Sequence, residues 1–298
     1  MANSITGIND DILSNAVLEG FVAEVLALTA FTTSFSADAV KKGEKVSVPR
    51  VGSQDAAATK TTHGAYTLQD SDSDAVEIAI GQPVYVSSAL DDSEVANSSV
   101  LTLDLYGKQK GAILAQAVVA DILSSVTLNN FGAAGLTSTA ANFDVDDVID
   151  LKAVCDAANM PMSPRAIVLG PTYVASLLKD NAIQNASAFG SSAPVKDGSI
   201  GKLAGFDVFN SNLVPANAQN LVGFAAHPAA LAIAMRYLKP QDGNTYSAAF
   251  PVTDEKTGIT LGVREGYDNL TGRKYKIWEA AYGYSVGIAA GLKRIVSA

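Results

Sequence analysis

The side chains best suited to chemistry in this sequence are one cysteine and two histidines. Cys155 lies on the apolar face of a predicted helix, and neither His63 nor His227 is near it in sequence. No HExxH or CxxC spacing occurs, and no GxSxG motif is present to use a histidine as its base. We therefore interpret Cys155 as a small core residue, His63 as a surface residue, and His227, which precedes Pro228, as a turn residue.

A glycine-rich segment, Gly-Ser-Ile-Gly-Lys at residues 198–202, resembles a phosphate-binding loop only in part. That loop requires a glycine five positions before its second glycine, and a serine or threonine after its lysine. The corresponding residues are Lys196 and Leu203. We interpret Gly201 and Gly205 as turn glycines and predict no nucleotide site.

Carboxylates are plentiful, but they occur in runs at residues 70–74, 91–94 and 144–147. Such runs are typical of solvated loops and helix starts. The first run also lacks the glycine and the later glutamate of a calcium loop. The sequence therefore predicts no catalytic, metal or cofactor site, and we expect a protein that is not an enzyme.

Composition excludes several classes of protein. The chain has 298 residues with a net charge of −9, and 48% of its residues are hydrophobic. A basic face for nucleic acid is not evident, because the densest basic groups, at residues 41–45 and 273–276, lie beside turns. A single cysteine cannot form an intrachain disulfide, which fits a reducing compartment. Neither a secretory signal nor an apolar stretch of membrane-spanning length occurs, so we expect no membrane association.

The elements that would position these residues begin with an N-terminal segment, residues 1–40. Asp10 or Asp11 could cap a helix there. The helix would carry an apolar face at spacings of three and four, formed by Leu13, Val17, Phe21, Val25 and Leu28. Nothing adjacent in sequence covers that face. We expect it to pack on a distant part of the fold or on a neighbouring subunit.

Residues 41–90 have the pattern of a long hairpin. Lys45–Pro49, Val76–Ile80 and Val84–Val86 alternate like strands, and the stretch from Gly52 to Asp74 is polar. An isolated two-stranded ribbon is marginally stable in water, and its free edges favour pairing with another chain. A hairpin folded onto its own domain, or a disordered loop, is the alternative interpretation.

The longest helical pattern covers residues 92–126, with Ser93 as a candidate cap. Gly107 and Gly111 share one face of this helix, where another backbone could approach closely. The apolar positions that recur every three or four residues are Leu101, Leu105, Ala112, Ala115, Val119, Ile122 and Val126.

An α/β pattern follows, over residues 143–257. Asp144 caps a predicted helix, Ala166–Leu169 is a short buried strand, and Pro171 opens another helix. The apolar stretch 229–235 fits neither helix nor strand better. The helix after Asp144 has a predicted apolar face of Val145, Val148, Ile149, Val154 and Cys155. Strand patterns at 259–267, 274–282 and 284–288 end the chain, so the segments on either side of 143–257 could form one discontinuous domain.

The segment GSIGKLAGFDVFNSN, residues 198–212, resembles a motif of the major capsid proteins of tailed bacteriophages, which have the HK97-type fold. The order of elements is similar over nearly the whole chain. The resemblance implies an α+β fold with a long spine helix. Its parts would be an N-terminal arm (1–40), an extended E-loop hairpin (41–90), a peripheral domain with the spine helix (91–142 and 258–298) and a central axial domain (143–257).

The function that this resemblance implies is self-assembly into an icosahedral shell of hexamers and pentamers, with a portal at one vertex, around double-stranded DNA. The shell should not bind that DNA tightly, since the DNA must later leave. The E-loop would lie across one neighbouring subunit and the arm would reach another. Since 40 residues precede the E-loop, we expect a separate scaffolding protein; the alternative is a scaffolding leader that has already been cleaved away. A decoration protein is a further candidate partner. The protein would reside in the virion after assembly in the bacterial cytoplasm.

Two other functions remain open from sequence: an encapsulin-type nanocompartment shell around cargo enzymes, and an intracellular α/β enzyme. Within the shell hypothesis, we predict contacts between subunits at the base of the E-loop, because opposite charges flank that junction. Basic residues there would pair with acidic residues of an adjacent subunit. The predicted contact residues are Lys41, Lys42, Lys45, Arg50, Asp91, Asp92 and Glu94.

Overall fold

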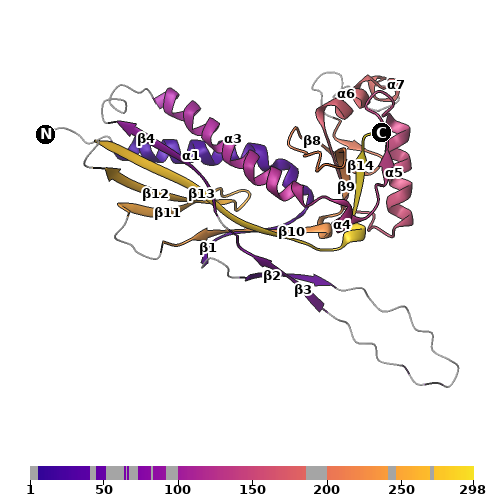
Figure 1. The fold of residues 1–298 in the computed structure, drawn as a ribbon, viewed down its shortest axis with the longest axis horizontal. Coiled ribbons are helices and arrows are strands. Elements are labelled where there is room, and N and C mark those ends of the chain that lie inside the picture. The colour runs from indigo at the N-terminus through magenta and orange to yellow at the C-terminus, as the bar shows by residue number, and fades with distance from the viewer. Residues whose placement is uncertain are drawn as a thin grey trace.

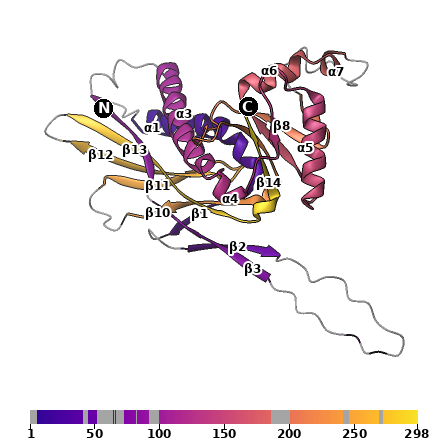
Figure 2. The same ribbon diagram turned by 45° about the vertical axis from the view of Figure 1, so that its right-hand side comes forward.

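The structure is a computed structural model that describes residues 6–40, 45–51, 64, 66, 73–81, 83–91, 100–185, 200–240, 246–268 and 272–298. Figure 1 shows a body with two β-sheets and a narrow hairpin that leaves the body on the side away from its two long helices. The same arrangement is seen after a 45° turn in Figure 2.

The first sheet has six strands, and two helices, α1 (Thr6–Glu24) and α3 (Val100–Ser124), cover one of its faces (Figure 1). A short 3-10 helix, η1 (Val25–Ala30), joins α1 to the sheet. The strand order is β1 (Thr32–Val40), β10 (Leu231–Leu238), β13 (Arg273–Val286), β12 (Thr260–Asp268) and β11 (Ala248–Thr253), and β4 (Val84–Asp91) also pairs with β13.

All five residues of the predicted apolar face are buried in the core between the first sheet and its two helices, although Val25 and Leu28 lie in η1 rather than in α1. One expectation for this segment is wrong: the helix begins at Thr6, so Asp10 and Asp11 lie inside it rather than at its cap. The segment packs on a distant part of the fold, which was one of the two expected alternatives, since α1 packs on α3 and β1 pairs in parallel with β10 of the same chain.

Glycines allow α1 and α3 to pack backbone against backbone. A Cβ at Gly111 would lie 2.0 Å from the carbonyl oxygen of Val17, and one at Gly20 would lie 2.3 Å from the carbonyl oxygen of Lys108. A Cβ at Gly107 would likewise lie 2.8 Å from the Cβ of Ala16. The predicted close approach at Gly107 and Gly111 is therefore confirmed, and the approaching backbone is the chain's own α1.

The predicted face of α3 is partly wrong. Ala115, Val119, Ile122 and Val126 are buried, but Leu105 is 61% exposed. Because a helix turns by about 100° per residue, Leu105 points almost opposite to Gly107, which faces α1. Residues 92–99, including Ser93, and the side chain of Leu101 lie outside the described residues.

The second sheet also has six strands, with two helices beside it, α5 (Val145–Ala157) and α6 (Pro171–Lys179). Short helices α4 (Leu128–Phe131), α7 (Asn181–Gln184), η2 (Pro228–Ala230) and η3 (Ala289–Gly291) complete the body. The strand order is β5 (Leu136–Thr137), β14 (Leu292–Val296), β9 (Leu221–Ala226), β6 (Ala166–Leu169), β8 (Phe206–Asn210) and β7 (Lys202–Leu203).

Helix α5 starts as predicted, because the carboxylate of Asp144 accepts a hydrogen bond from the backbone N–H of Asp147 at 3.1 Å. Its buried residues are Val148, Leu151 and Cys155. The prediction for Ile149 and Val154 is wrong, since they are 49% and 37% exposed. The stripe at spacings of three and four that starts from Val148 passes through Leu151 and Cys155 and leaves both of these side chains on the outer side.

Sheet membership differs from the predicted domain boundaries. β10 and β11 lie within 143–257, yet they pair with β13 and β12 from the range 258–298. Conversely, β14 from 258–298 pairs with β9 in the second sheet. The stretch 229–235, left unassigned, belongs largely to β10, and the strands predicted at 274–282 and 284–288 are one strand, β13. The ranges 143–257 and 258–298 therefore each supply strands to both sheets.

Two of the three strands predicted for the hairpin are confirmed there, whereas the third, Val84–Val86, lies in β4 and pairs with β13 in the first sheet. β2 (Lys45–Val51) and β3 (Ser73–Ala79) form a two-stranded antiparallel sheet of their own, with Lys45 opposite Ala79 and Val51 opposite Ser73. Between them the structure describes only residues 64 and 66, so the expectation for the polar tip lies mainly outside the described residues. The base of this hairpin rests on the first sheet.

Candidate assembly surface

The hairpin base packs on the face of the first sheet opposite α1 and α3. Leu231, Ile233 and Met235 of β10 belong to the core under the helices. Alternate residues of a strand point to opposite faces, so Ala232 and Ala234 face the other way. There they form a separate small cluster with Leu238, Ala281, Ile78 and Ile80. The hairpin base therefore has support from its own chain.

The predicted contact residues that the structure describes have oppositely charged residues as partners within the same chain, by an ion pair for Lys45 and by strand register for Arg50 and Asp91. Lys45 forms an ion pair with Glu77 across the hairpin, with both side chains more than half exposed. In the strand ladders, Arg50 is opposite Asp74 and Asp91 is opposite Arg273. Lys41, Lys42, Asp92 and Glu94 lie outside the described residues. Contacts with a second subunit stay a prediction.

The basic group at residues 273–276 has a structural role. The ammonium nitrogen of Lys276 lies 2.6 Å from Oε1 of Glu265, and both side chains are largely buried. Lys276 also bonds the hydroxyl of Ser14 at 3.2 Å, which ties α1 to the sheet. Lys274 lies 3.9 Å from the same glutamate. These lysines are thus committed to the fold rather than to a phosphate backbone.

Cys155 and His227, two of the residues best suited to chemistry by type, have structural roles. Cys155 is fully buried, and burial raises the pKa of its thiol. Nδ1 of His227 accepts a hydrogen bond from the backbone N–H of Ala229 at 3.2 Å, as a turn residue would. Burial, and then the charge of Arg165, lowers the pKa of His227. His63 lies outside the described residues.

No group of three or more metal-ligating side chains occurs within the described part of the chain. The helices described there include none that is both long and apolar enough to cross a membrane.

A tight hairpin turn directly follows the segment that resembled a phosphate-binding loop, whose residues 198 and 199 lie outside the described part of the chain. Lys202 pairs with Asp207, and Leu203 with Phe206, so Ala204 and Gly205 form a two-residue turn. Both turn residues have positive φ, 49° and 91°, as a type I′ turn requires. The interpretation of Gly205 as a turn glycine is confirmed.

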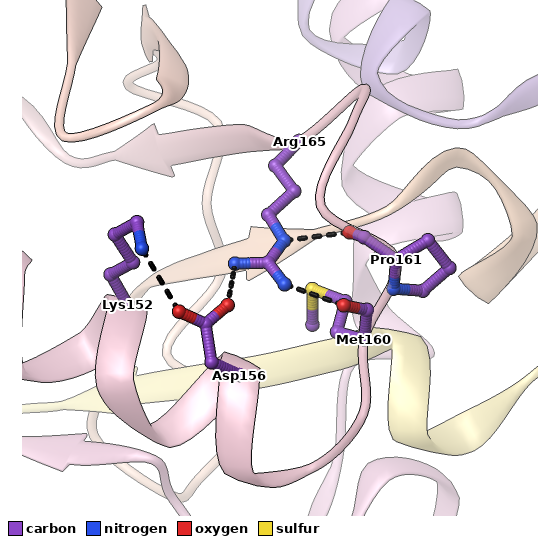
Figure 3. Close-up of polar contacts among 5 residues, drawn as sticks. All are labelled: Lys152, Asp156, Met160, Pro161 and Arg165. Atoms are coloured by element: carbon purple, nitrogen blue, oxygen red, sulfur yellow. Dashed lines mark hydrogen bonds and ion pairs between the residues drawn. The ribbon is translucent and has the colours of Figure 1, made fainter.

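A buried arginine missed in the sequence fixes the loop after α5 (Figure 3). Arg165 is 4% exposed, and its Nη1 lies 2.6 Å from Oδ1 of Asp156. Nε donates to the carbonyl of Pro161 at 2.7 Å, and Nη2 donates to the carbonyl of Met160. Lys152 bonds the other oxygen of Asp156 at 2.9 Å. The sequence signal was an arginine placed directly before a fully apolar strand.

A second missed cluster lies between the end of α3 and the second sheet. Arg294 of β14 donates to the carbonyl of Gly132 at 2.9 Å and to Oε1 of Gln219 at 2.8 Å. The amide of Asn217 donates to the carbonyls of Leu123 and Val126 at 3.1 and 2.9 Å. These bonds reach the carbonyl of Leu123 in the last turn of α3 and that of Val126, two residues beyond the helix. They fix α3 to the second sheet.

Comparison with known proteins identifies the fold. No family model and no curated protein matches the sequence. The capsid of cyanophage P-SCSP1u aligns over 90% of this chain and 86% of its own, with a TM-score of 0.58 and 15% identity. The mature capsid of bacteriophage PhiM1 aligns over 90% of this chain and 85% of its own, with a TM-score of 0.56 and 13% identity. A virus-like particle from Pyrococcus furiosus aligns over 95% of this chain and 97% of its own, with a TM-score of 0.53 and 12% identity. The expected resemblance to phage capsid proteins, and the α+β class, are confirmed as a likeness of fold.

Proposed function

We propose that this chain is the major capsid protein of a tailed bacteriophage, which assembles into an icosahedral shell around double-stranded DNA. The observation that carries the proposal is the alignment of about nine-tenths of the chain with phage capsid subunits. A two-stranded hairpin that projects from the body supports it independently, because such a ribbon is suited to contact another subunit.

In this proposal the hairpin is the E-loop and α3 is the spine helix. The first sheet, with α1 and α3, is the peripheral domain, and the second sheet, with α5 and α6, is the axial domain. The junction of Arg294, Gln219 and Asn217 would hold the two domains at one angle. This division follows strand pairing, so it replaces the sequence ranges first expected for the domains.

The role is structural rather than catalytic, and its partners are other copies of the chain in hexamers and pentamers. A net charge of −9 suits an enclosure that does not hold DNA tightly. A separate scaffolding protein, a portal at one vertex and a decoration protein complete the proposed set of partners, with assembly in the host cytoplasm.

Electron microscopy of the purified protein tests the proposal directly. We expect closed particles of uniform diameter, and nuclease-resistant DNA in particles recovered from the native source. A stable monomer at micromolar concentration, over a range of salt and with the hairpin ordered, would contradict it. Size-exclusion chromatography gives the same answer at low cost.

An encapsulin-type nanocompartment is the second candidate. The observation in its favour is the Pyrococcus furiosus virus-like particle, which aligns over 97% of its own length. The contents of the particle separate the two functions: packaged DNA supports the capsid, and a co-purifying protein cargo without DNA supports the nanocompartment.

A further inference from the structure

The hairpin meets the body at one very close backbone contact. A Cβ at Gly283 would lie 2.2 Å from the carbonyl oxygen of Ala79, and 2.8 Å from Cγ2 of Ile78. Next to it, the backbone N–H of Gly81 donates to the carbonyl of Tyr282 at 3.0 Å. The β3 backbone therefore lies directly on the β13 backbone at Gly283, which no other residue type would allow without a shift.

The surroundings of Gly283 hold the hairpin in one position. Ile78 and Ile80 are 0% and 2% exposed, and the sheet residues beneath them are mostly alanines. Because these residues are small, the two isoleucines can pack close to the sheet backbone. Just after Gly81, the chain enters β4, whose first residue, Val84, pairs with Ala280 of β13. β13 thus contacts the chain at Gly81, where the hairpin ends, and again at Val84, where β4 begins.

We propose that Gly283 is a positioning residue that sets the angle at which the hairpin leaves the body, and thereby the curvature of the assembled shell. The first part concerns the single chain. The second part rests on the proposed function.

Lever geometry gives the size of the effect. Relief of a contact at 2.2 Å needs a movement of about 1.3 Å to reach ordinary packing distance, about 3.5 Å. The hydrogen bond at Gly81 is the pivot, about 7 Å from Ala79 at 3.3 Å per strand residue. The movement is then a tilt of roughly 11°, which carries Ser73, about 26 Å from the pivot, through about 5 Å. A displacement of this size at a contact between subunits changes the angle between them.

The test compares Gly283→Ala with a matched control, Gly111→Ala, which places a methyl group 2.0 Å from a backbone oxygen far from the hairpin. Spin labels on Glu77→Cys and Gln109→Cys report the distance between hairpin and body in unassembled subunits. Cys155 is fully buried and should label slowly. Electron microscopy of particles from the same variants gives their diameter.

We expect Gly283→Ala to shift the label distance by several ångströms and to change the particle diameter or leave shells unclosed. Gly111→Ala should lower thermal stability and leave both measurements unchanged. An unshifted distance in folded Gly283→Ala overturns the positioning role. If that variant does not fold, Ile78→Val with Ile80→Val decides: the distance distribution should broaden, and an unchanged width overturns the role.

The two parts of the proposal fail separately. If wild-type protein forms no particles while the distance shift is present, the proposed function is wrong and the positioning role stands. If the distance shifts and the particles keep their diameter, the link to curvature is wrong.

Discussion

Arg165 carries a full positive charge at a site with almost no access to water, and its cost of burial is offset by three protein acceptors. Two of these acceptors are backbone carbonyls of the loop after α5. Removal of the guanidinium leaves those carbonyls without this donor, and an unsatisfied buried acceptor costs more than a lost surface contact. Lys152 contacts the same carboxylate from an exposed position, so it is the natural control.

We expect Arg165→Ala to lower the free energy of unfolding by about 3 kcal/mol. Lys152→Ala should leave it almost unchanged. Urea denaturation of unassembled subunits at pH 7 measures both. Equal losses in the two variants would show that the loop does not depend on the buried guanidinium.

The same site predicts a pH dependence. Hydrogen bonds from Lys152 and then Arg165 lower the pKa of Asp156. Because the folded pKa is the lower one, its stabilisation is present above the unfolded pKa of about 3.9 and is lost as pH falls through the folded pKa. The stability difference between wild type and Arg165→Ala should therefore narrow below about pH 4. Denaturation curves at pH 6 and pH 3 measure this, and a constant difference contradicts it.

Between elements, the contact of α1 with α3 depends on glycine despite its cost in a helix. By helix propensity alone, Gly111→Ala should raise the free energy of unfolding by about 1 kcal/mol. The added methyl group would meet Val17 O and Phe21 N at 2.0 and 2.8 Å. Both are backbone atoms of α1, so relief requires the helix to move, and overpacking typically costs about 1–3 kcal/mol.

We expect the clash to outweigh the propensity, with a net loss of about 1 kcal/mol in the free energy of unfolding. Gln109→Ala, on the exposed side of α3, is the control and should have no measurable effect. Increased stability of Gly111→Ala would mean that α1 can shift at little cost.

Spacing along the chain predicted most elements but not their partners. The face of α1 followed from Leu13, Val17 and Phe21, because periodicity is a local property. Leu105 fits the same periodicity in α3, yet it is exposed, because the position of α1 decides which side of α3 is buried. No local pattern carries that information.

The sheet to which each strand belongs, and the buried ion pairs, could not be predicted from sequence for a related reason. β10 and β14 are assigned to sheets by strands far away in sequence. Arg165 looks like any surface arginine until Asp156 and two carbonyls surround it. For the candidate site, the sequence alone was enough to locate the hairpin and its charged residues. The contact between the hairpin and Gly283 could be found only from the folded structure.

For the molecule as a whole, assembly should depend on the charges at the hairpin base. Lys45 pairs with Glu77 within the chain, so a contact with an adjacent subunit would exchange one exposed pair for another. Each exposed pair contributes about 0–1 kcal/mol, and a shell repeats the contact many times.

We expect Lys45→Ala with Arg50→Ala to raise the concentration needed for assembly by about three- to tenfold at low salt. The concentration needed for assembly should also depend less on salt in this double variant. Light scattering against protein and salt concentration measures this, with Lys256→Ala on an exposed turn as control. Unchanged assembly and salt dependence would remove these residues from the contact.

Gly283, which the hairpin contacts, lies far from the hairpin along the chain, and this separation affects folding during synthesis. Ile78 and Ile80 leave the ribosome about 200 residues before Gly283. At about 5–20 residues per second, the ribbon waits roughly 10–40 s before β13 exists to receive it. During that time it has two open edges and two uncovered isoleucines, the features of a chaperone substrate. The hairpin can be correctly oriented only on a nearly finished chain, so in the proposed shell it would contact a neighbouring subunit only after its own chain has folded.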